Sequence, residues 1–227
     1  MNYAEVLKQL EAFGSEQTRK TYRRHGAVGP MFGVKFGDLN KLVRQIKSDH
    51  SLALELWESG LFDARVLATM VADPARITMT ALAKWMKDVD CHSLSAALSN
   101  VAQRSPVAAK MMARGMKSRT ELVTSTAWVM LGGIARETPG LFSKAEYKAF
   151  LKTIEQEIHQ SKNRVKASMN GALIGIGTYV DEKAALIVAK RIGQVEVDHG
   201  DTSCKTPLAE PYIQKAAAKY RDKLAKK

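Results

Sequence analysis

The densest group of reactive side chains lies in the stretch DVDCHS, at residues 88–93. It brings carboxylates, a thiol, an imidazole and a hydroxyl together, directly ahead of an apolar stripe with helical spacing. Asp90 could stabilise a positive charge that develops during a reaction, and His92 could act as a general base near neutral pH. The structural alternative is that Asp90 only caps the helix that follows. Asp90 and His92 are therefore the candidate catalytic residues.

Two other chemistries use the same stretch. Cys91 could be a nucleophile, but adjacent residues on a helix point about 100° apart, so it would need a remote partner such as His199 rather than His92. No hydrolase motif surrounds it, and a buried, inert cysteine is the favoured interpretation. A metal site could combine these residues with Asp201 and Cys204, but the close-spaced ligand pairs of zinc sites are absent. We therefore expect no metal and no cofactor.

Composition favours a polyanionic partner. The chain has 227 residues, with 35 Lys and Arg against 23 Asp and Glu, a formal charge of +12. Such an excess favours nucleic acid, because each neutralised phosphate releases counterions; solubility alone is the alternative. Two distant cysteines, no secretory signal and no long apolar run predict a cytoplasmic protein without a membrane span. We expect a monomer with one domain covering residues 1–227.

The elements that must position these residues are helices. Hydrophobic residues recur with a helical period, and the alternation typical of strands is nearly absent. The segments form about five helical hairpins of roughly 30–45 residues each. Such pairs usually stack into an α-solenoid with a concave face, because no pair buries its apolar face alone; a closed bundle is the alternative. The expected helices cover residues 3–13, 16–26, 39–48, 51–60, 62–73, 75–87, 91–104, 106–118, 120–137, 144–160, 164–180, 182–193 and 208–227.

Several residues mark where these helices should begin. Side chains that accept hydrogen bonds from free N–H groups predict N-caps, and proline is favoured in the first turn. The predicted caps are Ser15, Asp38, Ser143 and Asp181, and the predicted opening prolines are Pro106 and Pro207.

Basic residues recur near the starts of the second helices of the pairs, where the helix dipole already favours anions. Trp85 and Trp128 could stack on a sugar or base, although core packing is the default for tryptophan at apolar positions, as for Trp57. Asn170 is a polar residue inside an apolar helix and could face a cleft. The candidate DNA-binding residues are Arg65, Trp85, Arg119, Trp128, Arg164, Lys166, Asn170 and Lys205.

The loop DHGDTSCKTP, at residues 198–207, admits two interpretations. It could be a structural connection that ties the last helix to the stack, with a sharp bend at Gly200. Alternatively, His199, Thr202 and Lys205 could contact phosphate. The structural interpretation is favoured.

Three segments resemble the bacterial DNA alkylation repair glycosylases built of HEAT-like repeats, the AlkD type. They are MFGVKFGDLNKLVRQI at 31–46, LALELWESGLFDARVLATMV at 52–71 and KWMKDVDCHSLSAAL at 84–98. The resemblance implies a HEAT-like solenoid with a basic concave surface that holds double-stranded DNA. It also implies metal-free excision of N3- and N7-alkylated purines by an acid, tryptophans and an arginine.

The family's functional positions carry other side chains here. The tryptophan of the reaction segment falls on Val89 and its catalytic acid on Ser93, while Asp90 keeps the first acid. The arginine falls near Ser125 or Thr126, and a later tryptophan falls near Gly171. The resemblance thus predicts a DNA-binding protein of a divergent branch, with glycosylase activity as its enzymatic form. A catalytically inactive scaffold that binds structured nucleic acid or a protein is the alternative.

Overall fold

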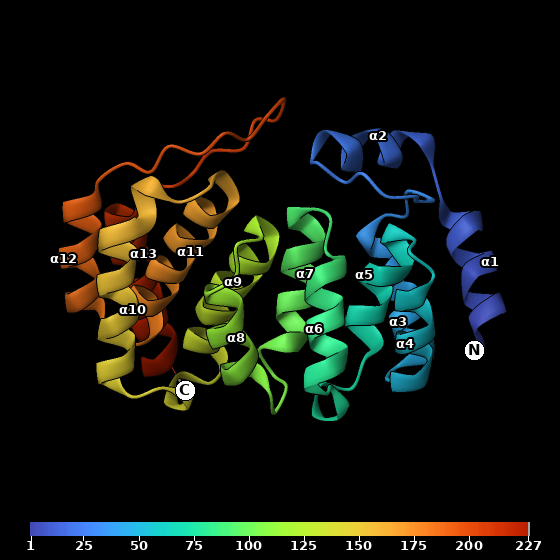
Figure 1. The fold of residues 1–227 in the computed structure, drawn as a ribbon, viewed down its shortest axis with the longest axis horizontal. Helices are drawn as coiled ribbons and strands as arrows, with labels where there is room; N and C mark the ends of the chain where they lie inside the picture. The colour runs from blue at the N-terminus through green and yellow to red at the C-terminus, as the bar shows by residue number, and fades with distance from the viewer. Residues whose placement is uncertain (227) are drawn as a thin grey trace. The chain divides into compact units, whose positions relative to one another are not determined.

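A computed structural model describes residues 1–226, and within them the protein is all-α, as predicted (Figure 1). No helix in this part of the chain is long and apolar enough to cross a membrane. Three short 3-10 turns, Pro74–Arg76, Pro139–Leu141 and Ile158–Gln160, join some of the helices. The α-helices are α1 (Tyr3–Phe13), α2 (Glu16–Arg24), α3 (Phe36–Ile46), α4 (His50–Glu58), α5 (Phe62–Val71), α6 (Met79–Asp88), α7 (His92–Ala102), α8 (Ala108–Met116), α9 (Glu121–Glu137), α10 (Lys144–Glu157), α11 (Asn163–Tyr179), α12 (Glu182–Ile192) and α13 (Ala209–Ala225).

The helices divide into two compact units. The first unit comprises Met1–Met111 and Gly200–Thr202, and the second comprises Met112–His199 and the chain from 203 onward. Each unit has its own buried apolar core. The single domain expected over residues 1–227 and the concave basic face both stay predictions.

Three of the four predicted N-caps are confirmed. The side chains of Ser15, Ser143 and Asp181 each accept a hydrogen bond from a backbone N–H three residues on. The prediction for Asp38 is wrong, because α3 begins two residues earlier, at Phe36. Asp38 lies in the first turn instead, where it pairs with Lys41 at 2.7 Å.

Neither proline that was expected to open a helix does so. α8 begins at Ala108, two residues after Pro106, because a turn at Ser105 comes first. α13 begins at Ala209, after an N-cap at Leu208. The carbonyl of Pro207 accepts a hydrogen bond from Asn170 Nδ2 at 2.9 Å and so lies outside the helix. Residue 227, the last that was expected in this helix, lies outside the described residues.

The first unit is organised around one buried carboxylate. Asp63, in α5, is 0% exposed, and its two oxygens accept hydrogen bonds from three successive backbone N–H groups. The donors are Phe32 at 2.7 Å, Gly33 at 3.1 Å and Val34 at 2.7 Å. Gly33 has a φ of 81°, and a Cβ there would lie 2.5 Å from the carbonyl oxygen of Ser15. Only glycine can therefore hold this segment in its place.

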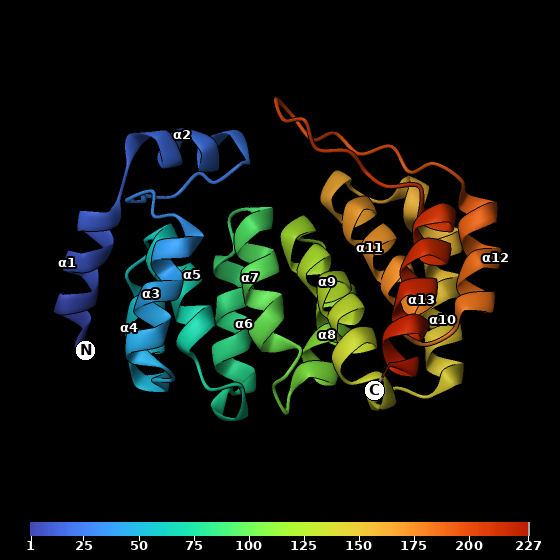
Figure 2. The ribbon, with the colours of Figure 1, turned by 180° about the vertical axis from the view of Figure 1, so that it is seen from behind.

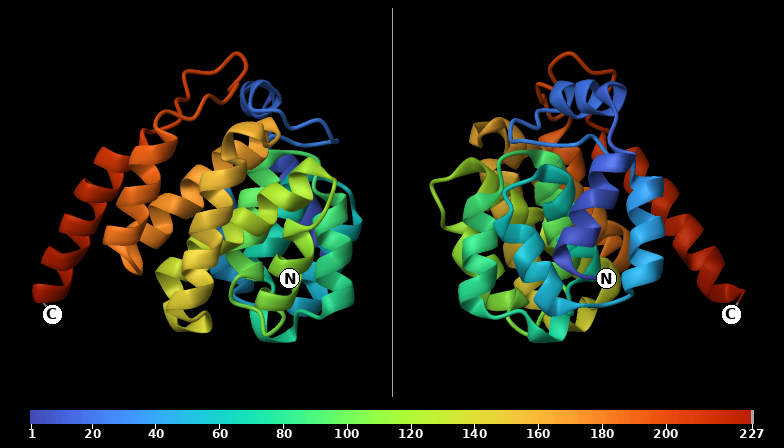
Figure 3. Two further views of the ribbon diagram at one scale, coloured as in Figure 1. Left: turned by 60° about the vertical axis from the view of Figure 1, so that its left-hand side comes forward. Right: turned by 90° about the vertical axis from the view of Figure 1, so that its right-hand side faces the viewer.

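The same contacts hold α2 over the unit. α2 lies across the ends of neighbouring helices (Figures 1 and 3). The Tyr22 hydroxyl donates to the Val34 carbonyl at 2.6 Å, and the Phe62 N–H donates to the Pro30 carbonyl at 2.9 Å. Burial, and secondarily the charge of Asp63, raises the pKa of Tyr22 to about 12. The glycine-rich bend at residues 26–33 is therefore a fixed part of the fold.

In the second unit, α11 packs against α9, α12 and α13 (Figure 2). Glycines make the crossing of α9 and α11 close, since a Cβ on Gly175 would lie 3.0 Å from the Cα of Gly132. Gly177 is equally crowded, with Ile213 and Ala185 side chains within 3 Å of a Cβ placed there. Gly175 and Gly177, two of the three glycines in the apolar segment 167–180, therefore serve helix packing.

Replacing Asp63 with Asn should destabilise the protein. The amide keeps the shape but would place N–H groups against backbone N–H groups that the carboxylate now accepts from. We expect the free energy of unfolding, measured by urea denaturation, to fall by about 2–4 kcal/mol. Asp38→Asn, which removes an exposed i,i+3 ion pair, should cost less than about 1 kcal/mol. Equal stability of the Asp63→Asn and native proteins would show that the carboxylate is not an anchor.

Candidate nucleic-acid interface

Asp90 lies in the short connection between α6 and α7. The prediction that it caps α7 is wrong, because the N-cap residue is Cys91. The Asp90 oxygen Oδ1 is buried and has no hydrogen-bond partner among residues 1–226. The other oxygen, Oδ2, faces Gly29 so closely that a Cβ on that glycine would lie 2.8 Å from it. The structure thus holds a half-buried, incompletely paired carboxylate against the glycine-rich bend.

Cys91 is a poor nucleophile in this setting. Its side chain is buried, and burial raises the pKa of the thiol to about 11. The charge of the neighbouring Asp90 acts in the same direction, while the backbone N–H of Leu94 opposes it. The interpretation of Cys91 as an inert buried cysteine agrees with this environment.

His92 is the first residue of α7, and its ring lies 6.4 Å from the ring of His25. His25 ends α2, so the bend held by Asp63 brings the two imidazoles together. Neither His25 nor Gly29 was a sequence candidate, since only the fold places them beside residues 90–92. Among residues 1–226, no three His, Cys, Asp or Glu side chains gather as a set that could hold a metal ion.

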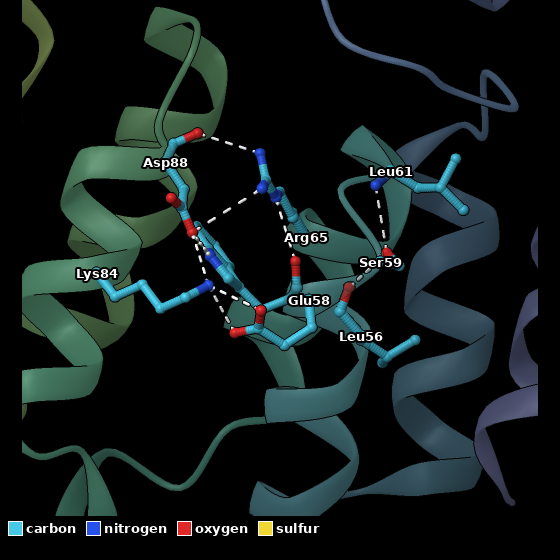
Figure 4. Close-up of polar contacts among 8 residues, drawn as sticks. Leu56, Glu58, Ser59, Leu61, Arg65, Lys84 and Asp88 are labelled. Atoms are coloured by element: carbon cyan, nitrogen blue, oxygen red, sulfur yellow. Dashed lines mark hydrogen bonds and ion pairs between the residues drawn. The ribbon is translucent and has the colours of Figure 1, made fainter.

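Arg65 makes several contacts within the first unit. Its guanidinium lies 5.4 Å from the centre of the Trp57 ring and donates to the carbonyls of Trp57 and Asp88, at 3.2 and 3.1 Å (Figure 4). The Asp88 carboxylate accepts from Trp57 Nε1 at 2.9 Å and from Lys84 at 3.2 Å. These internal contacts join α4, α5 and α6 and orient the Arg65 side chain, and its contact with DNA stays a prediction.

Three further candidates are buried. Trp85 is 2% exposed and stacks on Trp57 with ring centres 4.4 Å apart, and Trp128 is 3% exposed. Asn170 is 1% exposed, and its amide donates to the Pro207 carbonyl. Apolar packing accounts for both tryptophans, and Asn170 ties α11 to the loop ahead of α13. None of the three presents a surface that DNA can reach in this structure.

Three of the remaining candidates lie near the starts of two packed helices. Arg119 precedes α9, while Arg164 and Lys166 lie in the first turn of α11. Lys162, which was not predicted, precedes α11 and donates from Nζ to the Arg119 carbonyl at 3.0 Å. We call Arg119, Lys162, Arg164 and Lys166 the N-terminal basic cluster. Lys162 lies two residues before the candidate Arg164, and this position was the signal in the sequence that could have identified it.

One carboxylate moderates this positive charge. Glu121, in the first turn of α9, accepts a hydrogen bond from the Arg164 N–H at 2.7 Å. It therefore satisfies one free N–H of α11 and holds the two helix starts together. Arg119 and Lys162 are exposed, and Arg164 and Lys166 are half-buried. The cluster presents four cationic side chains beside helix N-termini, an arrangement suited to phosphate.

The loop between α12 and α13 is fastened to the second unit. Asn163 and Asp198 exchange two hydrogen bonds of 2.7 Å between the amide of Asn163 and the backbone of Asp198. His199 Nε2 lies 2.9 Å from the Thr206 hydroxyl. These contacts agree with the structural interpretation of the loop, while Lys205 is exposed on it and stays a candidate for phosphate.

The positions of the family's functional residues are partly at the surface. Ser93 is half-buried in the first turn of α7. Ser125 and Thr126 are buried, and their hydroxyls donate to the carbonyls of Arg164 and Leu122. Gly171 is exposed, with open space where a side chain would stand. The side chains of the resemblance are therefore missing at accessible places as well as buried ones.

Comparison with known proteins agrees with the resemblance. The profile of the protein family described as DNA alkylation repair enzyme matches residues 6–203. The uncharacterized protein Lin0241 of Listeria innocua is 31% identical over 224 residues, which cover 95% of this chain and 97% of that protein. The uncharacterized protein Lmo0209 of Listeria monocytogenes is 30% identical over 225 residues, with the same coverage of 95% and 97%.

A solved structure shares the fold. It is described as "A new family of proteins related to the HEAT-like repeat DNA glycosylases with affinity for branched DNA structures". The two chains are 28% identical and superpose with a TM-score of 0.86, covering 97% of this chain and 96% of the other. This likeness confirms the predicted HEAT-like fold class.

The two cysteines should differ sharply in reactivity. Cys204 is exposed, whereas Cys91 is buried with a pKa of about 11, so a thiol reagent at pH 8 should modify only Cys204. The Cys204→Ser variant should react only after denaturation. Full native-state modification of that variant would contradict the burial of Cys91.

The burial of Cys91 should also make stability depend on pH. Because unfolding returns the pKa of Cys91 toward 9, the contribution of the buried thiol to stability should be present below pH 9 and lost as the pH rises through 11.

Proposed function

The chain belongs to the family of DNA alkylation repair enzymes, and from that premise we propose that it binds DNA through the N-terminal basic cluster and prefers branched DNA. The observation that carries the proposal is the gathering of Arg119, Lys162, Arg164 and Lys166 at the starts of α9 and α11. Branched DNA is chosen because the related solved structure is described as having affinity for it. The protein acts as a cytoplasmic monomer without metal or cofactor.

The physical basis is neutralisation of backbone phosphates. Each phosphate neutralised by Lys or Arg releases condensed counterions. Each such contact therefore steepens the fall of log affinity with log salt concentration by about 0.9. The adjoining helix N-termini add partial positive charge where the guanidinium and ammonium groups lie. Such contacts recognise the DNA backbone and carry no information about the base sequence. A preference for branched over linear DNA would then come from the way the DNA strands, and so their phosphates, are arranged at the branch point.

A second candidate function is hydrolysis of the N-glycosidic bond of an alkylated purine. The observation that favours it is the Asp90 carboxylate, which keeps one buried oxygen without a hydrogen-bond partner. A carboxylate of this kind stabilises the developing oxocarbenium ion electrostatically. The side chains at Ser93 and Gly171 differ from those of the resembled glycosylases, so this reaction would depend on Asp90 and His92.

Charge removal at the N-terminal basic cluster should weaken DNA binding. We expect the double variant Arg164→Gln with Lys166→Gln to bind a four-way junction about tenfold less tightly than the native protein at moderate salt, because two phosphate contacts are lost. The slope of log affinity against log salt, measured by fluorescence anisotropy, should fall by about 2.

The matched control removes two exposed lysines from α10 of the same unit. Lys148→Gln with Lys152→Gln makes the same change in net charge, so a general effect of charge would appear equally in both variants. Junction affinity that falls equally in the two variants, or in neither, would contradict binding at the cluster.

Asp90 provides the test of the second candidate. If the native protein releases free base from DNA that carries 7-methylguanine, Asp90→Asn should abolish release while junction binding is unchanged, because the carboxylate acts only on the cationic transition state. Chromatography of the released base measures this directly. Absence of release by the native protein removes the glycosylase candidate, and full release by Asp90→Asn removes Asp90 from the mechanism.

A further inference from the structure

A groove of about 450 Å³ lies on the surface of the first unit between α3, α5 and α7. Its apolar lining includes Phe36 from α3 and Val66 and Met70 from α5. α7 contributes Ser93 and Asn100, with Ala96 and Ala97 between them, and Arg104 follows just after the end of the helix. The groove is therefore apolar on one side and polar along α7, and all of it belongs to one unit.

The polar side of the groove has unused binding capacity. Arg104 donates from Nε to the Asn100 carbonyl at 2.9 Å, which orients its guanidinium. The two Nη groups of Arg104 and the side-chain amide of Asn100 have no acceptor or donor within residues 1–226, and both side chains are exposed. Arg104 is the only charged residue that lines the groove. A ligand that fits this side carries an anionic group and a hydrogen-bonding edge.

The apolar side suits a flat ring. Phe36 is 49% exposed, and the edge contact of its ring with Tyr22, 6.5 Å between centres, holds it in place. The small side chains Ala96 and Ala97 leave room for close approach along α7. Aromatic side chains of this kind serve as stacking platforms for single-stranded bases, because every base has a π-face.

We propose that the groove holds one unpaired nucleotide of a branched DNA. Its base stacks against Phe36 and the apolar wall, Asn100 pairs with the edge of the base, and Arg104 binds the adjoining phosphate. The charge of the groove favours this occupant over an apolar peptide, which would leave the Arg104 guanidinium without a partner. This inference rests on the proposed function and adds recognition of an unpaired nucleotide to it.

The test separates the base from its phosphate. Two three-way junctions carry one unpaired residue at the branch, either an adenosine or an abasic nucleotide with the same phosphate. Native protein should bind the adenosine junction about tenfold more tightly, because stacking on an aromatic ring is worth roughly 1–3 kcal/mol per base. Phe36→Ala should reduce this ratio to about one, and Phe36→Trp should retain it. Arg104→Gln should weaken binding of both junctions by a similar factor.

Leu54→Ala is the matched control, because Leu54 is an exposed apolar residue of α4 in the same unit and does not line the groove. It should leave both affinities unchanged. A native ratio of one, or a ratio that Phe36→Ala does not alter, would overturn the groove proposal while leaving junction binding intact. Failure to bind either junction would instead reject the proposed function and the groove proposal with it.

Discussion

The buried carboxylate of Asp63 is the constraint on which the first unit depends. By accepting three successive backbone N–H groups it fixes a glycine-rich segment that has no secondary structure of its own. An unpaired carboxylate at this depth would be costly, so the segment and α5 each require the other. Through this segment Gly29 reaches Asp90, and His25 reaches His92. Asp63 lies outside the reactive stretch at residues 88–93, but it holds the segment that surrounds this stretch.

The two units use their charged residues differently. In the first unit, Arg65, Asp88 and Lys84 are joined with Trp57 in an internal set of hydrogen bonds and ring contacts (Figure 4). In the second unit, four cationic side chains lie at the starts of α9 and α11, and Glu121 joins these two starts. The second unit therefore offers a cluster of cationic side chains at two helix starts, whereas the first unit offers a groove with an aromatic wall and one arginine, Arg104.

Helical period, capping residues and glycine positions were enough to predict the all-α fold and the N-caps Ser15, Ser143 and Asp181. They could not tell that α3 starts at Phe36, because the start depends on the segment that Asp63 fixes. Burial decided three of the site candidates: Trp85, Trp128 and Asn170 carry suitable chemistry, but packing places them in the core. A single sequence also could not show that the Arg65 guanidinium would form hydrogen bonds with the carbonyls of Trp57 and Asp88. The positions of Arg119, Arg164 and Lys166 near helix starts could be predicted, because a helix start is a local property of the sequence, and their contact with DNA stays a prediction.

Hydrogen exchange of the protein with and without a four-way DNA junction tests the central claim most directly. It shows which backbone N–H groups of the protein become protected when DNA phosphates bind beside them. The account predicts slower exchange of the N–H groups at the starts of α9 and α11, around residues 119–125 and 162–168, with α10 unchanged. Slower exchange confined to α10 or α1, with none at those two helix starts, would contradict it.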